Sequence, residues 1–317
     1  MESEMQVLRN GYLTIAVYCV STALSAVWVT FAFSNISGST LTFIALLTAY
    51  VIFLGAHLMR GGRPFDLLRK HFSEVVILNM LTVAAWYFMF LALQRIEASV
   101  ESAIYQGCVP IAVLVCGLFA GQASFWSLRT LGCILISLCL FSLVAARIAT
   151  EGVIAIEMSR LYSGIALAII AGIAGGVYVY WSAKVVKKTQ CKTLDILCNR
   201  FYLLIVLTGA VGLSQSLGTT LHAIDLTLLG RLVLLSLVSV VIPVFTLQHA
   251  IVVLGAPRVS IIVPSVPALA LLVEQSFVGW PSPLVPSLIV ATCVAVLFSN
   301  AWMSMRPTNH ALSSAKP

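Results

Sequence analysis

Charge is what this chain of 317 residues lacks, since only 9% of its residues are Asp, Glu, Lys or Arg. A soluble domain carries about a quarter charged residues, so the composition excludes an ordinary water-soluble protein. Hydrophobic residues make up 60% of the chain, and the mean hydropathy is +1.04. We therefore expect a protein whose solvent is the lipid bilayer, and we do not interpret the net charge of +7 as a nucleic-acid site.

Motifs for metal and nucleotide binding are also missing from the sequence. The eight cysteines form no Cys-x-x-Cys pair and lie mostly inside apolar runs, as small buried side chains do. A Gly-Lys-Ser/Thr phosphate loop is absent, and histidines and carboxylates are scattered. The sequence therefore predicts no metal, no cofactor and no enzyme.

Long apolar runs are abundant, and a membrane-spanning helix needs about 20 such residues. Ten runs qualify: 12–33, 40–59, 75–94, 98–120, 128–146, 162–182, 196–215, 229–250, 257–277 and 284–304. The first is too long for the core of a signal peptide. The predicted fold is an all-α integral membrane protein with ten transmembrane helices.

Basic residues are distributed unequally between the two sides of these predicted spans. With the N-terminus inside, 14 of the 18 lysines and arginines fall on the inner side. Such residues concentrate in cytoplasmic loops. We predict a multi-pass protein of the inner (plasma) membrane with both termini cytoplasmic, the last residues, 307–317, forming a cytoplasmic tail.

The two halves of the chain resemble each other. "LQRIEASVESAIYQGCVPIAVLVCGLFAG" and "IVVLGAPRVSIIVPSVPALALLVEQSFVG" each contain a tight turn and a new helix with a proline, Pro110 or Pro267. Five spans per half would place the two copies in opposite orientations, which is typical of transporters. We predict inverted five-helix repeats over residues 1–150 and 151–306.

The stretch "AWYFMFLALQRIEASVESAIYQGCVP" resembles the third-to-fourth-helix signature of EamA-type proteins of the drug/metabolite transporter superfamily. "VFTLQHAIVVLGAPRVSIIVPSVPALA" is similar to the matching stretch of their second repeat, and Arg200 in "DILCNRFYLL" matches their Arg-Phe pattern. The resemblance implies a ten-helix carrier whose central cavity opens alternately to each side.

The predicted function is secondary-active transport, as a proton-coupled exporter, of a small organic metabolite such as an amino acid or a related compound. The alternative is a non-transport assembly or lipid-handling subunit on the same fold. The expected partners are a small-molecule substrate and the lipid bilayer, without nucleic acid. The chain is expected to be a monomer or a homodimer.

Four ionisable residues in or near the spans are candidates for substrate binding or coupling, because such residues tend to face a cavity. Glu101 is either a first-turn carboxylate favoured by the helix dipole or a proton- or cation-binding carboxylate at the cavity mouth. Glu274 is either an interfacial carboxylate that extends to the headgroups or a titratable gate residue of the outer vestibule. His249 is either an interfacial cation or a group that titrates near neutral pH. Arg200 either extends to the cytoplasmic headgroups or attracts an anionic substrate.

Aromatic and sulfur-containing residues complete the predicted site. Glu101, Tyr105 and Cys108 share one helical face, which we place in the cavity against Trp86. Tyr178 belongs either to an interfacial aromatic belt or to a substrate-stacking surface.

Prolines and small residues indicate bending and close packing. Pro110, Pro243, Pro264 and Pro267 interrupt predicted spans, and Pro110 and Pro267 are the expected hinges of a rocking gate. The run 162–182 has a small residue at every fourth position of one stripe, namely Gly164, Ala168, Gly172 and Gly176. The stripe permits close helix contact, either within the chain or in a dimer.

Overall fold

The structure is a computed structural model that describes residues 2–32, 38–122, 124, 127–150, 158–215, 226–278 and 284–305, and within them all regular elements are helices. The α-helices are α1 (Glu2–Ala32), α2 (Gly38–Met59), α3 (Asp66–Lys70), α4 (Phe72–Leu93), α5 (Ala98–Phe119), α6 (Leu128–Thr150), α7 (Met158–Thr189), α8 (Thr193–Leu197), α9 (Tyr202–Gln215), α11 (Leu226–Ser236), α12 (Ile242–Leu254), α13 (Ala256–Ile262), α14 (Ser265–Val278) and α15 (Leu284–Met305). A π-helical turn, Leu237–Val241, joins α11 to α12.

Most of these helices are apolar enough to lie in lipid. In the described part of the chain, seven helical segments are long and apolar enough to cross a membrane, and two shorter apolar helices cover Phe43–Met59 and Thr130–Ala146. The chain is therefore a helical, multi-pass membrane protein, as its composition predicts. The number of ten spans and the inverted repeat stay predictions.

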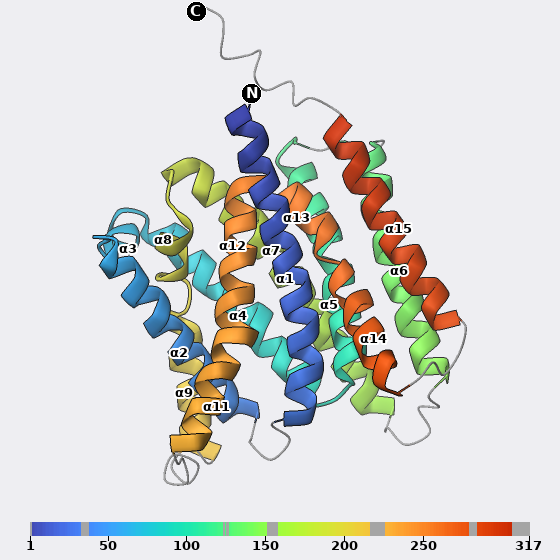
Figure 1. Cartoon of the computed structure of the whole chain (residues 1–317), viewed down its shortest axis with the longest axis horizontal. Helices are drawn as coiled ribbons and strands as arrows, with labels where there is room; N and C mark the ends of the chain where they lie inside the picture. The colour runs from blue at the N-terminus through green and yellow to red at the C-terminus, as the bar shows by residue number, and fades with distance from the viewer. Residues whose placement is uncertain are drawn as a thin grey trace, which may run out of the picture.

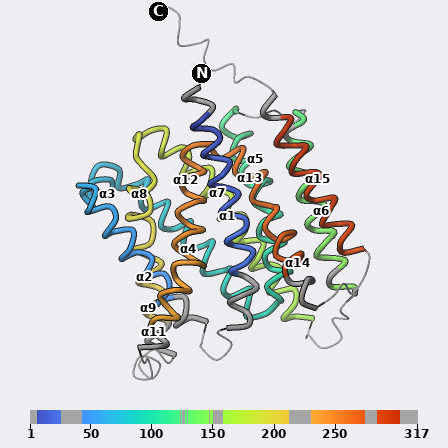
Figure 2. The backbone as a smooth tube through the Cα atoms, in the orientation of Figure 1, coloured from blue at the N-terminus to red at the C-terminus, as the bar shows by residue number. Residues whose placement is uncertain are grey.

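The helices form one bundle in which segments far apart in sequence lie side by side (Figure 1). Helix α7 packs against α4 and α5, α1 packs against α12 and α14, and α6 packs against α15 at one edge. The start of α1 and the end of α15 lie at the same end of the bundle, as the backbone trace in Figure 2 also shows. The contacts therefore join the first half of the chain to the second along most of the bundle.

Small residues allow α7 to approach α5 closely. A Cβ atom added at Gly172 would lie 2.6 Å from the carbonyl oxygen of Tyr105, and one added at Gly176 would lie 2.8 Å from that of Val109. Backbone-to-backbone contact of this kind requires glycine. The small-residue stripe thus serves a contact within the chain, while the oligomeric state stays a prediction.

Two predicted spans are not continuous helices. The predicted run 196–215 contains a break at residues 198–201 between α8 and α9, and the run 257–277 contains a break at residues 263–264 between α13 and α14. Pro264 accounts for the second break, because proline lacks an N–H. Since no proline lies at the first break, its cause must lie elsewhere in the fold.

Candidate solute cavity

A cavity of about 340 Å³, here called the central cavity, is enclosed by α1, α4, α5, α7, α12 and the π-helical turn. Its polar and aromatic lining consists of Tyr18, Thr22, Ser25, Trp86, Glu101, Ser102, Tyr105, Gln106, Tyr178, Arg200 and Ser239. Apolar residues such as Met89 and Leu247 line the rest. Small-molecule sites of about 300–1,000 Å³ combine an apolar wall with a few polar groups in this way.

Buried polar atoms without a hydrogen-bond partner collect around the central cavity. Five of them belong to its lining: Thr22 Oγ1, Glu101 Oε1, Gln106 Oε1, Arg200 Nε and Ser239 Oγ. Elsewhere in the described residues, only His57 and Trp181 carry such a side-chain atom. Leaving a buried polar group unpaired costs about 1–3 kcal/mol. The clustering of these unpaired atoms in one cavity lining indicates a surface that can form hydrogen bonds with a polar solute.

Arg200 is held against the aromatic part of this wall. It is 4% exposed, and its guanidinium carbon lies 4.0 Å from the ring centroid of Tyr178 and 4.9 Å from that of Phe201. The Tyr178 hydroxyl donates to Gln248 Oε1 at 2.6 Å, and Gln248 Nε2 donates to Ser182 Oγ at 2.8 Å. This buried network fixes the ring on which Arg200 rests.

The positions of Arg200 and Tyr178 decide two alternatives that the sequence left open. Arg200 points into the protein interior and does not extend to the headgroups. Tyr178 is 3% exposed and lies well before the end of α7, because this helix continues to Thr189. Both side chains are buried within the bundle, and both line the central cavity.

Glu101 brings a carboxyl group to the same cavity. It is 4% exposed, and the described residues provide neither of the two charged groups with an ion-pair partner. A cation–π contact contributes about 0.5–2 kcal/mol, whereas a buried charge left without its partner costs about 3–5 kcal/mol. Two such contacts contribute about 1–4 kcal/mol, so they offset part of this cost for Arg200, and Glu101 has no contact of this kind.

Helix α5 turns two of its three predicted residues toward the cavity. Glu101 and Tyr105 line it, together with Gln106. Cys108 was predicted on the same face, but the structure does not bring it to the cavity, because its side chain packs against α7 at Gly172. Each residue turns the helix by about 100°, so position 108 lies roughly 20° from position 101 around the helix axis. This rotation is directed away from position 106, and α7 covers Cys108 on that side.

The other predicted side chains lie in different places. Trp86 lines the central cavity beside Phe90, with ring centroids 6.0 Å apart. The structure does not bring His249 to the cavity, because its Nδ1 lies 3.2 Å from the Thr193 hydroxyl and its ring stacks on Phe245. The side chain of Glu274 lies outside the described residues.

The two predicted hinge prolines occupy different environments. Pro110 is buried within α5, which continues past it to Phe119, and Ser137 Oγ donates to the nearby carbonyl of Gly107 at 2.6 Å. Pro267 lies in the first turn of α14, where a missing N–H is tolerated. The break in this segment precedes Pro267, so any hinge there is better placed at residues 263–264.

Thr22, Gln106 and Ser239 line the cavity but were not predicted as site residues. Each is a polar residue inside an apolar run, which was the available signal. Ser239 lies in the π-helical turn, and such turns often occur at functional sites.

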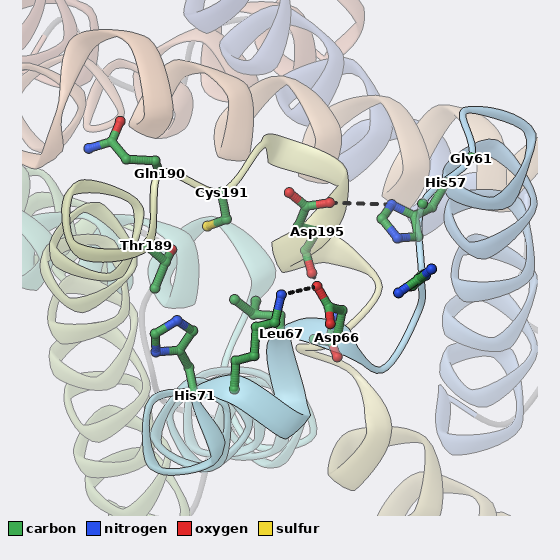
Figure 3. A pocket seen from close by; sticks show the side chains of 13 residues that line it. His57, Gly61, Asp66, Leu67, His71, Thr189, Gln190, Cys191 and Asp195 are labelled. Carbon is green, nitrogen blue, oxygen red and sulfur yellow. Dashed lines mark hydrogen bonds and ion pairs between the residues drawn. The ribbon is translucent and has the colours of Figure 1, made fainter.

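A second cavity of about 490 Å³, here called the loop-side cavity, lies where α2 meets α3 and α7 meets α8 (Figure 3). His57 Nδ1 lies 3.4 Å from Asp195 Oδ1, and Lys70 Nζ lies 2.9 Å from Asp66 Oδ2. The hydrogen bond from Lys70 lowers the pKa of Asp66. Both acids thus face a nearby basic group, unlike Glu101 in the central cavity.

Cys191 provides a test of which side of the membrane this loop-side cavity faces. The residue lines the cavity between α7 and α8, and burial raises the pKa of its thiol. Because the thiolate is the reactive form, we expect slow labelling at neutral pH that accelerates as the pH rises. In intact cells an impermeant maleimide should modify Cys191 only after permeabilisation, as peptide mapping would show. Labelling from outside would contradict cytoplasmic loops.

The apolar helices and their packing define a class, the helical multi-pass membrane proteins, and this one contains a cavity lined by polar and aromatic side chains. Residues 9–145 match the model of the EamA-like transporter family. The match confirms, over these residues, the resemblance to the drug/metabolite transporter superfamily. This family is one of membrane transporters.

The fold of the chain is shared with a solved structure. No curated protein is significantly similar to it in sequence. A solved structure, titled "Crystal structure of protein", is 15% identical, with a TM-score of 0.70, and the alignment covers 96% of this chain and 100% of the other. At this identity the likeness concerns the fold alone, but it extends beyond residues 9–145 to nearly the whole chain.

Proposed function

We propose that the protein is a secondary-active transporter that exports a small dipolar organic metabolite, such as an amino acid or a related compound, in exchange for protons. The observation that carries the proposal is the central cavity, where, among the described residues, five buried side-chain polar atoms have no hydrogen-bond partner and neither Arg200 nor Glu101 has an ion-pair partner. A solute with a carboxylate and an ammonium group complements both charges.

The lining suggests a role for each group. Arg200 binds the solute carboxylate by charge-assisted hydrogen bonds, which are about twice as strong as neutral ones. Glu101 binds the ammonium group, while Trp86 and Tyr105 contact the apolar body of the solute. Because an apolar surround strengthens these interactions relative to water, the cavity favours solutes that present both charges together.

The transport cycle that we propose follows from the predicted inverted repeats. The two halves move against each other, so that the central cavity opens alternately to the two sides of the inner membrane. The breaks at residues 198–201 and 263–264 are positions where such movement requires little change within a helix. Both lie beside the cavity, since Arg200 and Val263 line it.

Counterflow in proteoliposomes tests the proposal directly. Radiolabelled L-phenylalanine, which is dipolar and aromatic, should exchange at least about tenfold faster than phenethylamine or phenylpropionate, each of which lacks one charge. A tenfold preference corresponds to about 1.4 kcal/mol, well within the value of one charge-assisted contact. Equal and protein-independent rates for dipolar and singly charged solutes would overturn the proposal.

Glu101→Gln tests proton coupling. Glutamine keeps the shape of the side chain but can neither take up nor release a proton, so accumulation driven by a pH gradient should fall about tenfold or more, while gradient-free counterflow continues. Ser102→Ala, a change to the neighbouring lining residue that leaves the carboxylate in place, is the matched control. Unchanged gradient dependence in Glu101→Gln would assign coupling to another group.

A further inference from the structure

The break at residues 198–201 places Arg200 in the central cavity. Helix α8 ends at Leu197 and α9 begins at Tyr202. Asn199 lines the loop-side cavity, while its neighbour Arg200 lines the central cavity. The interrupted segment therefore lies between the two cavities, and its backbone decides in which of them the guanidinium lies.

Asn79 on α4 occupies the opened turn of this segment. In a continuous α-helix the N–H of Leu203 would donate to the carbonyl of Asn199, four residues earlier. Instead, Asn79 Nδ2 donates to the Asn199 carbonyl oxygen at 2.6 Å, and Asn79 Oδ1 accepts from the Leu203 N–H at 3.2 Å. The side-chain amide thus takes the place of one backbone hydrogen bond.

The chemistry of this position favours a carboxamide. Asn79 is 6% exposed and also donates to the carbonyl of Val75 on its own helix at 2.9 Å. The two backbone groups at the break need a donor and an acceptor at once, and the buried carboxamide of Asn79 supplies both. A side chain inserted into the hydrogen-bond ladder is a known cause of a sharp helix kink.

We propose that Asn79 is a positioning residue for Arg200, holding the 198–201 break open so that the guanidinium rests on Tyr178 in the central cavity. It acts from the first half of the chain on a segment 120 residues away. The part concerning solute affinity rests on the proposed function, whereas the part concerning the break does not.

Asn79→Leu tests the proposal, because leucine has a similar size but neither a donor nor an acceptor. Thr82→Val is the matched control, since Thr82 is also buried on α4 but donates only to Leu78 of the same helix, at 2.7 Å. Amide hydrogen exchange of residues 199–203 should accelerate at least about tenfold in Asn79→Leu, as expected for a lost hydrogen bond, and stay unchanged in Thr82→Val.

The placement of Arg200 can be read independently of transport. Phenylglyoxal modifies accessible arginines, and peptide mass mapping follows each one separately. In Asn79→Leu, modification of Arg200 should accelerate at least about fivefold, because the guanidinium leaves its stacked position. If Asn79→Leu fails to fold, the smaller and polar Asn79→Ser should shift both readouts in the same direction. Unchanged exchange and unchanged Arg200 reactivity in a folded variant would overturn the proposal.

Counterflow of L-phenylalanine separates positioning from a general structural role. Asn79→Leu should raise KM about tenfold with little change in kcat, and it should have no further effect in an Arg200→Gln background, since coupled residues are not additive. Equal effects in both backgrounds would show that Asn79 acts elsewhere. If the wild type moves no dipolar solute, the proposed function fails, while exchange and phenylglyoxal reactivity still decide whether Asn79 positions Arg200.

Discussion

Arg200→Gln should reduce the affinity for L-phenylalanine by at least about 30-fold, while the weaker counterflow of phenethylamine should change little. Arg200 lies on the Tyr178 ring and is the arginine of the central cavity lining. Removing one partner of a buried, hydrogen-bonded charge pair costs about 2–5 kcal/mol, and each 1.4 kcal/mol is a factor of ten. KM and kcat from initial rates in proteoliposomes measure the effect.

Arg95→Gln is the matched control for the lost positive charge. Arg95 lies in the connection between α4 and α5, where it donates to the carbonyl of Leu91 at 3.3 Å, and it does not line the central cavity. We expect wild-type kinetics from this variant. If the two variants lose affinity equally, overall charge and not the cavity decides recognition.

Gly175→Ala should reduce counterflow about tenfold or more, although it adds only one methyl group. A Cβ atom at this position would lie 2.2 Å from the Tyr105 hydroxyl oxygen and 2.7 Å from the adjoining ring carbon. The Tyr105 ring must move, and overpacking of this kind costs about 1–3 kcal/mol. Because both residues line the central cavity, the displaced ring narrows the space for solute. Counterflow of L-phenylalanine measures the loss.

Two further variants distinguish this local effect from general helix changes. Gly55→Ala adds a methyl group to α2 where nothing lies within 4 Å, so its counterflow should match the wild type. Tyr105→Phe removes the atom closest to the added methyl group, so part of the lost activity should return in Gly175→Ala/Tyr105→Phe. An inactive double variant with normal folding would place the damage outside the Tyr105 contact.

Charge and cavity shape should affect solute selection in different ways. In the proposed function, Arg200 and Glu101 select solutes by charge, whereas Tyr105, which lies against Gly175, limits their size. A substitution of Arg200 or of Glu101 should therefore change the preference for dipolar over singly charged solutes. A variant at Gly175 should instead change the preference among dipolar solutes of different size.

Much of the architecture could be predicted from local sequence patterns. Low charge and long apolar runs predicted a helical membrane protein, because backbone groups in lipid must be paired within the chain. Glu101 and Tyr105 were predicted on a cavity face because ionisable residues in spans tend to avoid lipid, and the structure places both in the central cavity. Pro264 marked the break between α13 and α14 through its missing N–H.

Other features depend on contacts between distant segments, and periodicity does not reveal them. Cys108 shares the spacing of Glu101 and Tyr105, but α7 covers it, and no local pattern states which neighbour faces each side of a helix. No proline lies at the break before Tyr202, so the local sequence does not reveal this break. We attribute it to the side-chain amide of Asn79, which belongs to another helix. The sequence by itself determined that this protein lies in the lipid bilayer and roughly which residues form its helices. Only tertiary packing decided that Arg200 faces the central cavity, because the backbone beside it is held by two hydrogen bonds to Asn79, which form across the bundle.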